Sequence, residues 1–179
     1  DRELRNIIIQ LSPFGITPNY CLKIYKKYKS SAIEVINKNP YQLAEDIRGI
    51  GFKVADSIAS KIGIDKNSKD RICQGILYTL NKSLSNGHTY LPEHVLIQDS
   101  EKLLELNGEI IKECVMMLVY NQKIHIEKVN NENLIYLMPY YLAENGVCSQ
   151  IVKLSQYEFE DLKIDIDNEI NVLEEDKKI

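Results

Sequence analysis

The sequence has no tryptophan, no C-x-x-C pair and no long hydrophobic run. A membrane-spanning helix needs about 20 mostly apolar residues, whereas apolar stretches such as Val115–Val119 have the length of a buried segment in a globular core. The first residues also lack the basic-then-apolar pattern of a secretory signal. We therefore expect a globular protein with no membrane partner and a cytoplasmic location.

The four cysteines are widely spaced, and each lies within an apolar helical pattern; they are Cys21, Cys73, Cys114 and Cys148. In a small secreted protein four cysteines would suggest two disulfides, but this placement favours buried free thiols and a reducing compartment. The histidines His88, His94 and His125 have no cysteine or further histidine at ligand spacing. We expect no metal site.

No G-x-x-x-x-G-K-[ST] motif occurs in the sequence. That motif forms the loop that cradles nucleotide phosphates and supplies the lysine that contacts them. Serine, histidine, cysteine and acidic residues also show no spacing typical of a catalytic triad or dyad. We therefore expect this segment to contain no catalytic residues, to bind no cofactor and to be non-enzymatic.

Charge is distributed unevenly around a net value of −4. Residues 1–90 carry 14 Lys and Arg against 8 Asp and Glu, whereas residues 91–179 carry 8 against 18. The overall acidity argues against broad non-specific binding to nucleic acids, but the basic first half permits a local phosphate-binding face. Alternatively, cations such as Lys26, Lys27 and Lys29 only solvate a helix.

The hydrophobic spacing predicts a mainly α-helical fold. Proline and glycine mark the limits of several helices, with Pro18 suited to a first turn and Gly63 to a helix end. The expected helices include residues 2–11, 18–28, 52–62, 108–120 and 139–154, with a long helix from residue 67 or 68 to Asn86. Residues 88–91 are expected to be extended, and alternating residues at 123–129 and 134–138 predict a β-hairpin.

These elements suggest three regions. Residues 1–66 are expected to form a tandem helix-hairpin-helix DNA-binding domain. Residues 67–155 are expected to form a winged-helix-like helical domain with a small β-hairpin at residues 123–138. Residues 156–179 carry 9 acidic residues, and they suggest an acidic linker with some strand character around residues 162–166.

An internal repeat is the most informative feature. Phe14-Gly15-Ile16-Thr17 precedes Arg48-Gly49-Ile50-Gly51 by 34 residues, and each tetrapeptide lies between two predicted helices. A tight turn needs glycine where the backbone is left-handed or must approach another group closely. The isoleucine side chain would pack the turn against both helices, which leaves the N–H groups at the start of the second helix exposed.

Such a helix N-terminus carries partial positive charge and unpaired donors, so a DNA phosphate fits there. Phosphate contacts hold DNA without reading its sequence. The second hairpin, within Gly49–Ala59, carries the stronger signal, because Thr17 leaves less room in the first. The expected DNA-binding residues are Gly15, Ile16, Thr17, Lys23, Gly49, Ile50, Gly51 and Lys53.

Four segments resemble RecD-like (RecD/TraA type) DNA helicases in their helix-hairpin-helix region, and the resemblance spans roughly residues 4–154. They are Phe14-Gly-Ile-Thr-Pro18, the N-P-Y-x-L motif within Ala32–Leu43, Asp46–Asp56, and the G-H-x-x-L-P motif at Gly87–Pro92. The resemblance implies a parent 5′-to-3′ helicase in DNA recombination or repair, whose motor uses ATP and magnesium. Since the sequence begins at Asp1 within a helical pattern, we expect a segment of that longer protein, with the motor domains of the same chain after Ile179.

Three functions remain open at this point. The first is sequence-independent binding of DNA, single-stranded or at a junction. The second is a protein-docking module in which the hairpins only pack helices. The third is a sequence-specific winged helix, which conflicts with a third helix carrying Glu109, Glu113 and only Lys112. Four tyrosines of the basic half, Tyr20, Tyr25, Tyr28 and Tyr41, either stack on single-stranded bases or line the core.

Overall fold

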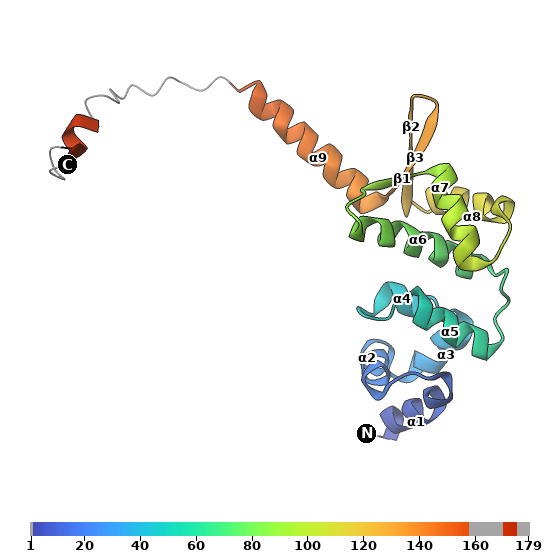
Figure 1. The fold of residues 1–179 in the computed structure, drawn as a ribbon. Coiled ribbons are helices and arrows are strands. Elements are labelled where there is room, and N and C mark those ends of the chain that lie inside the picture. The colour runs from blue at the N-terminus through green and yellow to red at the C-terminus, as the bar shows by residue number, and fades with distance from the viewer. Residues whose placement is uncertain (1, 158–169, 175–179) are drawn as a thin grey trace. The chain divides into compact units, whose positions relative to one another are not determined.

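The computed structural model describes residues 2–157 and 170–174 (Figure 1). Residues 1–142 form one compact unit and residues 143–179 a second one, and each is considered by itself. The expected strand character around residues 162–166 lies outside the described residues. None of the described helices is long and apolar enough to cross a membrane.

The first part of the chain is a series of short helices. Their order is α1 (Arg2–Leu11), a 3-10 turn (Ser12–Phe14), α2 (Pro18–Tyr28), a 3-10 turn (Lys29–Ser31), α3 (Ala32–Lys38), α4 (Gln42–Asp46) and α5 (Phe52–Ile62). Pro18 begins α2, since its missing N–H would have no helical partner there. Gly63 ends α5 in a left-handed conformation, with φ of 87°.

The second part combines four longer helices with a small sheet. It consists of α6 (Lys69–Ser85), β1 (Tyr90–Pro92), α7 (Glu93–Leu104), α8 (Gly108–Tyr120), β2 (Ile124–Val129), β3 (Glu132–Leu137) and α9 (Met138–Ser155). The strands are antiparallel in the order β1-β3-β2. A mainly helical fold with a β-hairpin is confirmed.

The hairpin turn between β2 and β3 consists of Asn130 and Asn131, which are both left-handed with φ of 47° and 66°. A two-residue turn with both positions left-handed matches the twist of the flanking strands, and asparagine tolerates that conformation. The extended stretch before α7 is β1, which pairs with β3 through Leu91 opposite Ile135. It makes the predicted hairpin a three-stranded sheet.

Two clusters of buried side chains form the core, and α5 contributes to both. Ile58 belongs to the cluster formed with α1–α4, in which Ile7, Leu11, Ile24 and Ile36 are also buried. From the same helix, Phe52, Ala55 and Ala59 pack into the cluster of α6–α8 and the sheet. This shared helix fixes the second hairpin against the long helices. The proposed domain boundary near residue 66 stays a prediction.

The cysteines do not all follow the expectation of burial. Cys21 and Cys114 are buried and Cys73 is half-buried, but Cys148 is exposed. The expectation was wrong for Cys148, because the described residues of its unit leave that stretch of α9 uncovered, and Val147 and Ile151 are each 60% exposed as well. Burial raises the pKa of the Cys73 thiol to about 12, which keeps it protonated at neutral pH.

Candidate nucleic-acid interface

The first hairpin turns at Gly15, which is left-handed with φ of 74°. Its N–H donates a 3.0 Å hydrogen bond to the carbonyl of Ser12, closing the 3-10 turn that follows α1. Ile16 is only 4% exposed and packs into the first core cluster. Thr17 then occupies the N-cap position of α2, where its side chain makes no capping hydrogen bond.

The second hairpin repeats this arrangement. Gly49 is left-handed with φ of 98°, and Ile50 is 2% exposed. Gly51 is the N-cap residue of α5 in an extended conformation, so it has no side chain to cap the helix. A Cβ atom placed on Gly51 would meet nothing within 4 Å. The space in front of this helix start is therefore open.

The amides at the start of α5 are available to a ligand. Within the described part of the chain, no acceptor is found for the N–H groups of Gly51, Phe52 and Lys53, whereas those of Val54 and Ala55 both donate to the Gly51 carbonyl. Gly51 and Lys53 are exposed residues. Free donors at a helix N-terminus attract an anion through both hydrogen bonding and the helix dipole.

In two later helices, a side chain caps one of the free backbone amides at the N-terminus. Ser68 accepts a 3.3 Å hydrogen bond from the Arg71 amide at the start of α6. Asn107 accepts a 2.9 Å hydrogen bond from the Glu109 amide at the start of α8. A side-chain cap removes one of the donors that an anion would use. The two hairpin helices, α2 and α5, lack such a cap, as do α3, α4 and α7.

The two hairpins contact each other, because side chains from the helix of each hairpin bond the turn of the other. From α2, the Tyr20 hydroxyl donates to the Gly49 carbonyl at 2.8 Å, and Lys23 Nζ donates to the Arg48 carbonyl at 3.0 Å. From α5, Lys61 Nζ donates to the Pro13 carbonyl at 3.4 Å. These reciprocal bonds bring the turns together and place an ammonium group beside each.

The lysines lie directly against the hairpin glycines. A Cβ atom on Gly15 would be 3.2 Å from Lys61 Nζ, and one on Gly49 would be 3.4 Å from Lys23 Nζ. Each ammonium retains further donors after bonding one carbonyl. No local pattern indicated Lys61, which lies in the last turn of α5 and contacts a residue 48 positions earlier.

The predicted site residues divide by exposure. Gly15, Thr17, Gly49, Gly51 and Lys53 are exposed, and Lys23 is half-buried with its ammonium on the second hairpin. The side chains of Ile16 and Ile50 are packed in the core and cannot reach a ligand. Their role in the fold is to pack each turn against its two helices, as the repeat predicted.

Four tyrosines of the basic half, at positions 20, 25, 28 and 41, have a partner within the protein for the hydroxyl group. Besides Tyr20, Tyr25 bonds Glu3 at 3.3 Å. Tyr28 bonds Asp46 at 2.6 Å. Tyr41 bonds Asp56 at 2.6 Å and is only 1% exposed. These contacts favour the core interpretation, and burial excludes base stacking by Tyr41.

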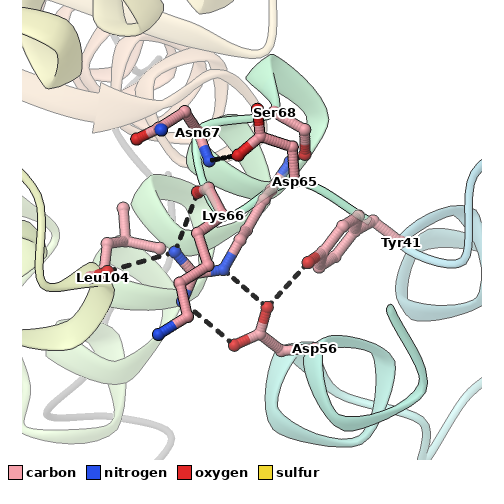
Figure 2. A network of polar contacts seen from close by, with 8 residues as sticks. Tyr41, Asp56, Asp65, Lys66, Asn67, Ser68 and Leu104 are labelled. Atoms are coloured by element: carbon pink, nitrogen blue, oxygen red, sulfur yellow. Dashed lines mark hydrogen bonds and ion pairs between the residues drawn. The ribbon is translucent and has the colours of Figure 1, made fainter. Parts of the chain in front are cut away.

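A polar network joins the second hairpin helix to the rest of the unit (Figure 2). Arg71 of α6 forms a two-pronged contact with Asp56 of α5, from Nε to Oδ1 at 2.8 Å and from Nη2 to Oδ2 at 3.2 Å. Its Nη1 donates to the carbonyls of Lys66 and Leu104, each at 3.1 Å. Burial disfavours the charged guanidinium, but Asp56 outweighs it and raises the pKa of Arg71.

A family model described as the ATP-dependent RecD2 DNA helicase HHH domain matches residues 1–90. The chain belongs to this family. The RecD2 helix-hairpin-helix match covers both hairpins, α6 and the first residue of β1. The chain therefore has a DNA-binding role associated with a helicase, and the resemblance to RecD-like helicases is confirmed over this range. For residues 91–154 the resemblance stays a prediction.

The RecD2 match describes the helix-hairpin-helix domain of the helicase. Among residues 2–157 and 170–174, no group of three or more His, Cys, Asp or Glu side chains is arranged to hold a metal ion. The chemistry that the described site offers is anion binding, by backbone amides at two helix starts and by the lysines beside them.

Proposed function

We propose that the two hairpins grip the sugar-phosphate backbone of DNA without reading its sequence. The observation that carries this proposal is the pairing of two uncapped helix starts by the bonds of Tyr20, Lys23 and Lys61. One phosphate oxygen would accept hydrogen bonds from the amides of Gly51–Lys53, and a second would lie at the start of α2. Lys53 would add charge without adding selectivity.

Sequence independence follows from which groups face outward. Backbone amides and ammonium groups match phosphate, which is the same at every nucleotide, and the isoleucines between the glycines are buried. In the second half, α8 presents exposed Glu109 and Glu113 beside Lys112, which would repel a phosphate-lined groove. Base reading by this helix therefore has little support.

We further propose that this segment is non-catalytic, and that ATP and magnesium act in the motor of the parent helicase. In this arrangement the segment holds DNA while the motor moves along it, in recombination or repair. A grip on phosphates suits such a role, since a translocating helicase must bind every sequence it meets. The form of DNA proposed is a single strand or a junction.

Protein docking is the second candidate function. It is favoured by the acidic balance of residues 91–179 and by large apolar side chains on the surface of α8, where Met116 is 61% and Tyr120 is 89% exposed. Exposed apolar side chains grouped on one helix often mark a protein-binding surface. In that case the hairpins would only pack helices.

Replacement Gly51→Asp tests the phosphate grip directly. An aspartate at this N-cap would fit the open space, and its carboxylate would accept hydrogen bonds from the free amides and repel a phosphate. The replacement should change helix stability by only a few tenths of a kcal/mol. Loss of one charge-assisted contact predicts at least a tenfold weaker affinity for DNA. Binding is measured by fluorescence anisotropy with a labelled duplex, single strand and forked junction.

Two matched variants serve as controls. Gly51→Ala adds a methyl group without charge, and Asn107→Asp adds the same charge at the start of α8, where the residue already caps its helix. Both should bind DNA within about twofold of the unaltered chain. With about 2–4 phosphate contacts, log K should fall against log salt with a slope of roughly −2 to −3.5. Equal binding by folded Gly51→Asp would refute the grip.

A further inference from the structure

A cavity of about 480 Å³ lies outside the hairpins, between the C-terminal half of α6, the turn that follows it, β1 and α7. Ligand pockets in proteins have volumes of about 300–1,000 Å³. The cavity therefore has room for a group as large as one nucleotide. The phosphate grip described above does not use it.

The walls of this cavity are of two kinds. Tyr78, Leu91 and Val95 are its apolar lining residues, and Lys82 and Lys102 are its lining residues with a positive charge. Lys102 shares its charge with Asp99, whose Oδ1 lies 3.3 Å away. No acidic side chain of the described residues lies within ion-pair distance of Lys82, so its charge is available to an anionic ligand.

The G-H-x-x-L-P motif builds part of the cavity. Gly87 is left-handed with φ of 87°, which turns the chain at the end of α6. His88 and Leu91 of the same motif both line the cavity, the first as an exposed residue and the second as a buried one. The phosphate grip of the hairpins does not use this motif, whereas His88 and Leu91 place it at the cavity.

The cavity is also connected to the second hairpin through aromatic rings. Phe52 directly follows Gly51, and its ring centroid lies 5.6 Å from that of Tyr78 in the cavity wall. On its other side Phe52 stacks on Tyr41, with a centroid separation of 6.0 Å. The wall is therefore anchored to the first residue of α5, next to the amides proposed to bind phosphate.

We propose that this cavity accepts one unpaired nucleotide of a DNA strand. Its base would lie against Tyr78 and Leu91, and its phosphate would pair with Lys82. An apolar wall beside an unpaired cation matches a nucleotide, which joins an apolar ring to an anionic group. A base inside a duplex cannot enter, so the cavity selects single strands. The inference rests on the proposed hairpin grip in one respect, because the hairpins would bring the DNA strand to the cavity.

NMR titration of the ¹⁵N-labelled chain with dTMP and dAMP tests the cavity without involving the hairpins. We expect saturable shifts of amides around Lys82, His88 and Lys102, with a Kd in the millimolar range expected of a small weak ligand. Lys82→Glu should weaken this binding at least tenfold, and His88→Ala should weaken it less. Both side chains belong to exposed residues, so both variants should keep the fold of the unaltered chain.

Further variants separate this inference from the grip. Gly51→Asp should leave mononucleotide binding unchanged, and Lys112→Glu, which places the same charge change outside the cavity, should also leave it unchanged. Lys82→Glu should weaken binding of a single strand about tenfold and alter duplex binding less than twofold. Absence of shifts, equal shifts with inorganic phosphate alone, or insensitivity to Lys82→Glu would each overturn the proposal.

Discussion

The hydroxyl of Tyr20 donates a 2.8 Å hydrogen bond to the carbonyl of Gly49, so a side chain on the helix of one hairpin holds the turn of the other. Lys23 reinforces this contact one helical turn later, at the Arg48 carbonyl. The distance between the two helix starts is thereby set before any ligand arrives. Such preorganisation favours binding, because less conformational freedom is lost on association.

Replacement Tyr20→Phe removes this hydrogen bond and keeps the ring. We expect the free energy of unfolding to fall by about 0.5–1.5 kcal/mol, the usual net value of one hydrogen bond. DNA affinity should fall about threefold or more, since the second hairpin loses part of its support. Urea unfolding and anisotropy titration measure the two effects.

Replacement Tyr25→Phe is the matched control, because Tyr25 lies on the same helix and its hydroxyl bonds Glu3 instead. It should change stability by a similar amount or less and leave DNA affinity unaltered. If the two variants bound DNA equally well, the contact between Tyr20 and Gly49 would have no part in positioning the hairpins.

Replacement Arg71→Met leaves the Asp56 carboxylate without its main partner and removes the donors to the Lys66 and Leu104 carbonyls. The Arg71 side chain is 11% exposed and that of Asp56 is 27% exposed, so water replaces these contacts poorly. We expect a loss of about 3 kcal/mol in the free energy of unfolding, measured by urea denaturation.

The exposed ion pair of Lys123 with Glu45 provides the comparison, with side chains 48% and 40% exposed. Lys123→Met should cost less than about 1 kcal/mol, because water screens such a pair. A loss below 1 kcal/mol for Arg71→Met as well would mean that the network in Figure 2 contributes little to joining α5 and α6.

Stability should fall at alkaline pH because of Tyr28 and Tyr41. Burial, followed by the hydrogen bonds to Asp46 and Asp56, raises the pKa of each hydroxyl above its usual value. Tyrosine in an unfolded chain ionises near pH ~10. Above that pH the unfolded state has released protons that the folded state still holds, so unfolding becomes easier as the pH rises.

This contribution should be complete below pH ~10 and disappear progressively above it. Urea denaturation at a series of pH values measures the slope, and the double variant Tyr28→Phe with Tyr41→Phe should reduce it. Slopes that were identical with and without the two hydroxyls would assign the alkaline loss to other groups.

Local sequence signals predicted the limits of four helices. The expected helices at residues 2–11, 18–28, 52–62 and 108–120 coincide with α1, α2, α5 and α8. Proline at a first turn, glycine at a helix end and apolar spacing act over a few residues, so they can be read along the chain. The number of strands in the sheet was less clear from the sequence, because β1 becomes a strand only by pairing with β3.

The partners of the site residues were not predictable in this way. Lys61 contacts Pro13 across 48 positions, and Arg71 contacts Leu104 across 33. Lys23 was predicted from its charge, but no local pattern indicated that its ammonium would bond a carbonyl of the other hairpin. Cys148 was expected to be buried, although apolar spacing alone does not reveal whether another element covers that face of a helix.

The amino-acid sequence by itself determined the repeated glycine turns, the helices around them and the division between a basic and an acidic half. Each depends on residue type and short spacing, through backbone conformation and charge. Only the tertiary structure decided that the two turns lie together, which lysines accompany them, and that Tyr78 in the cavity wall packs on Phe52. Those features depend on contacts between residues far apart in the chain, which packing creates and local sequence does not specify.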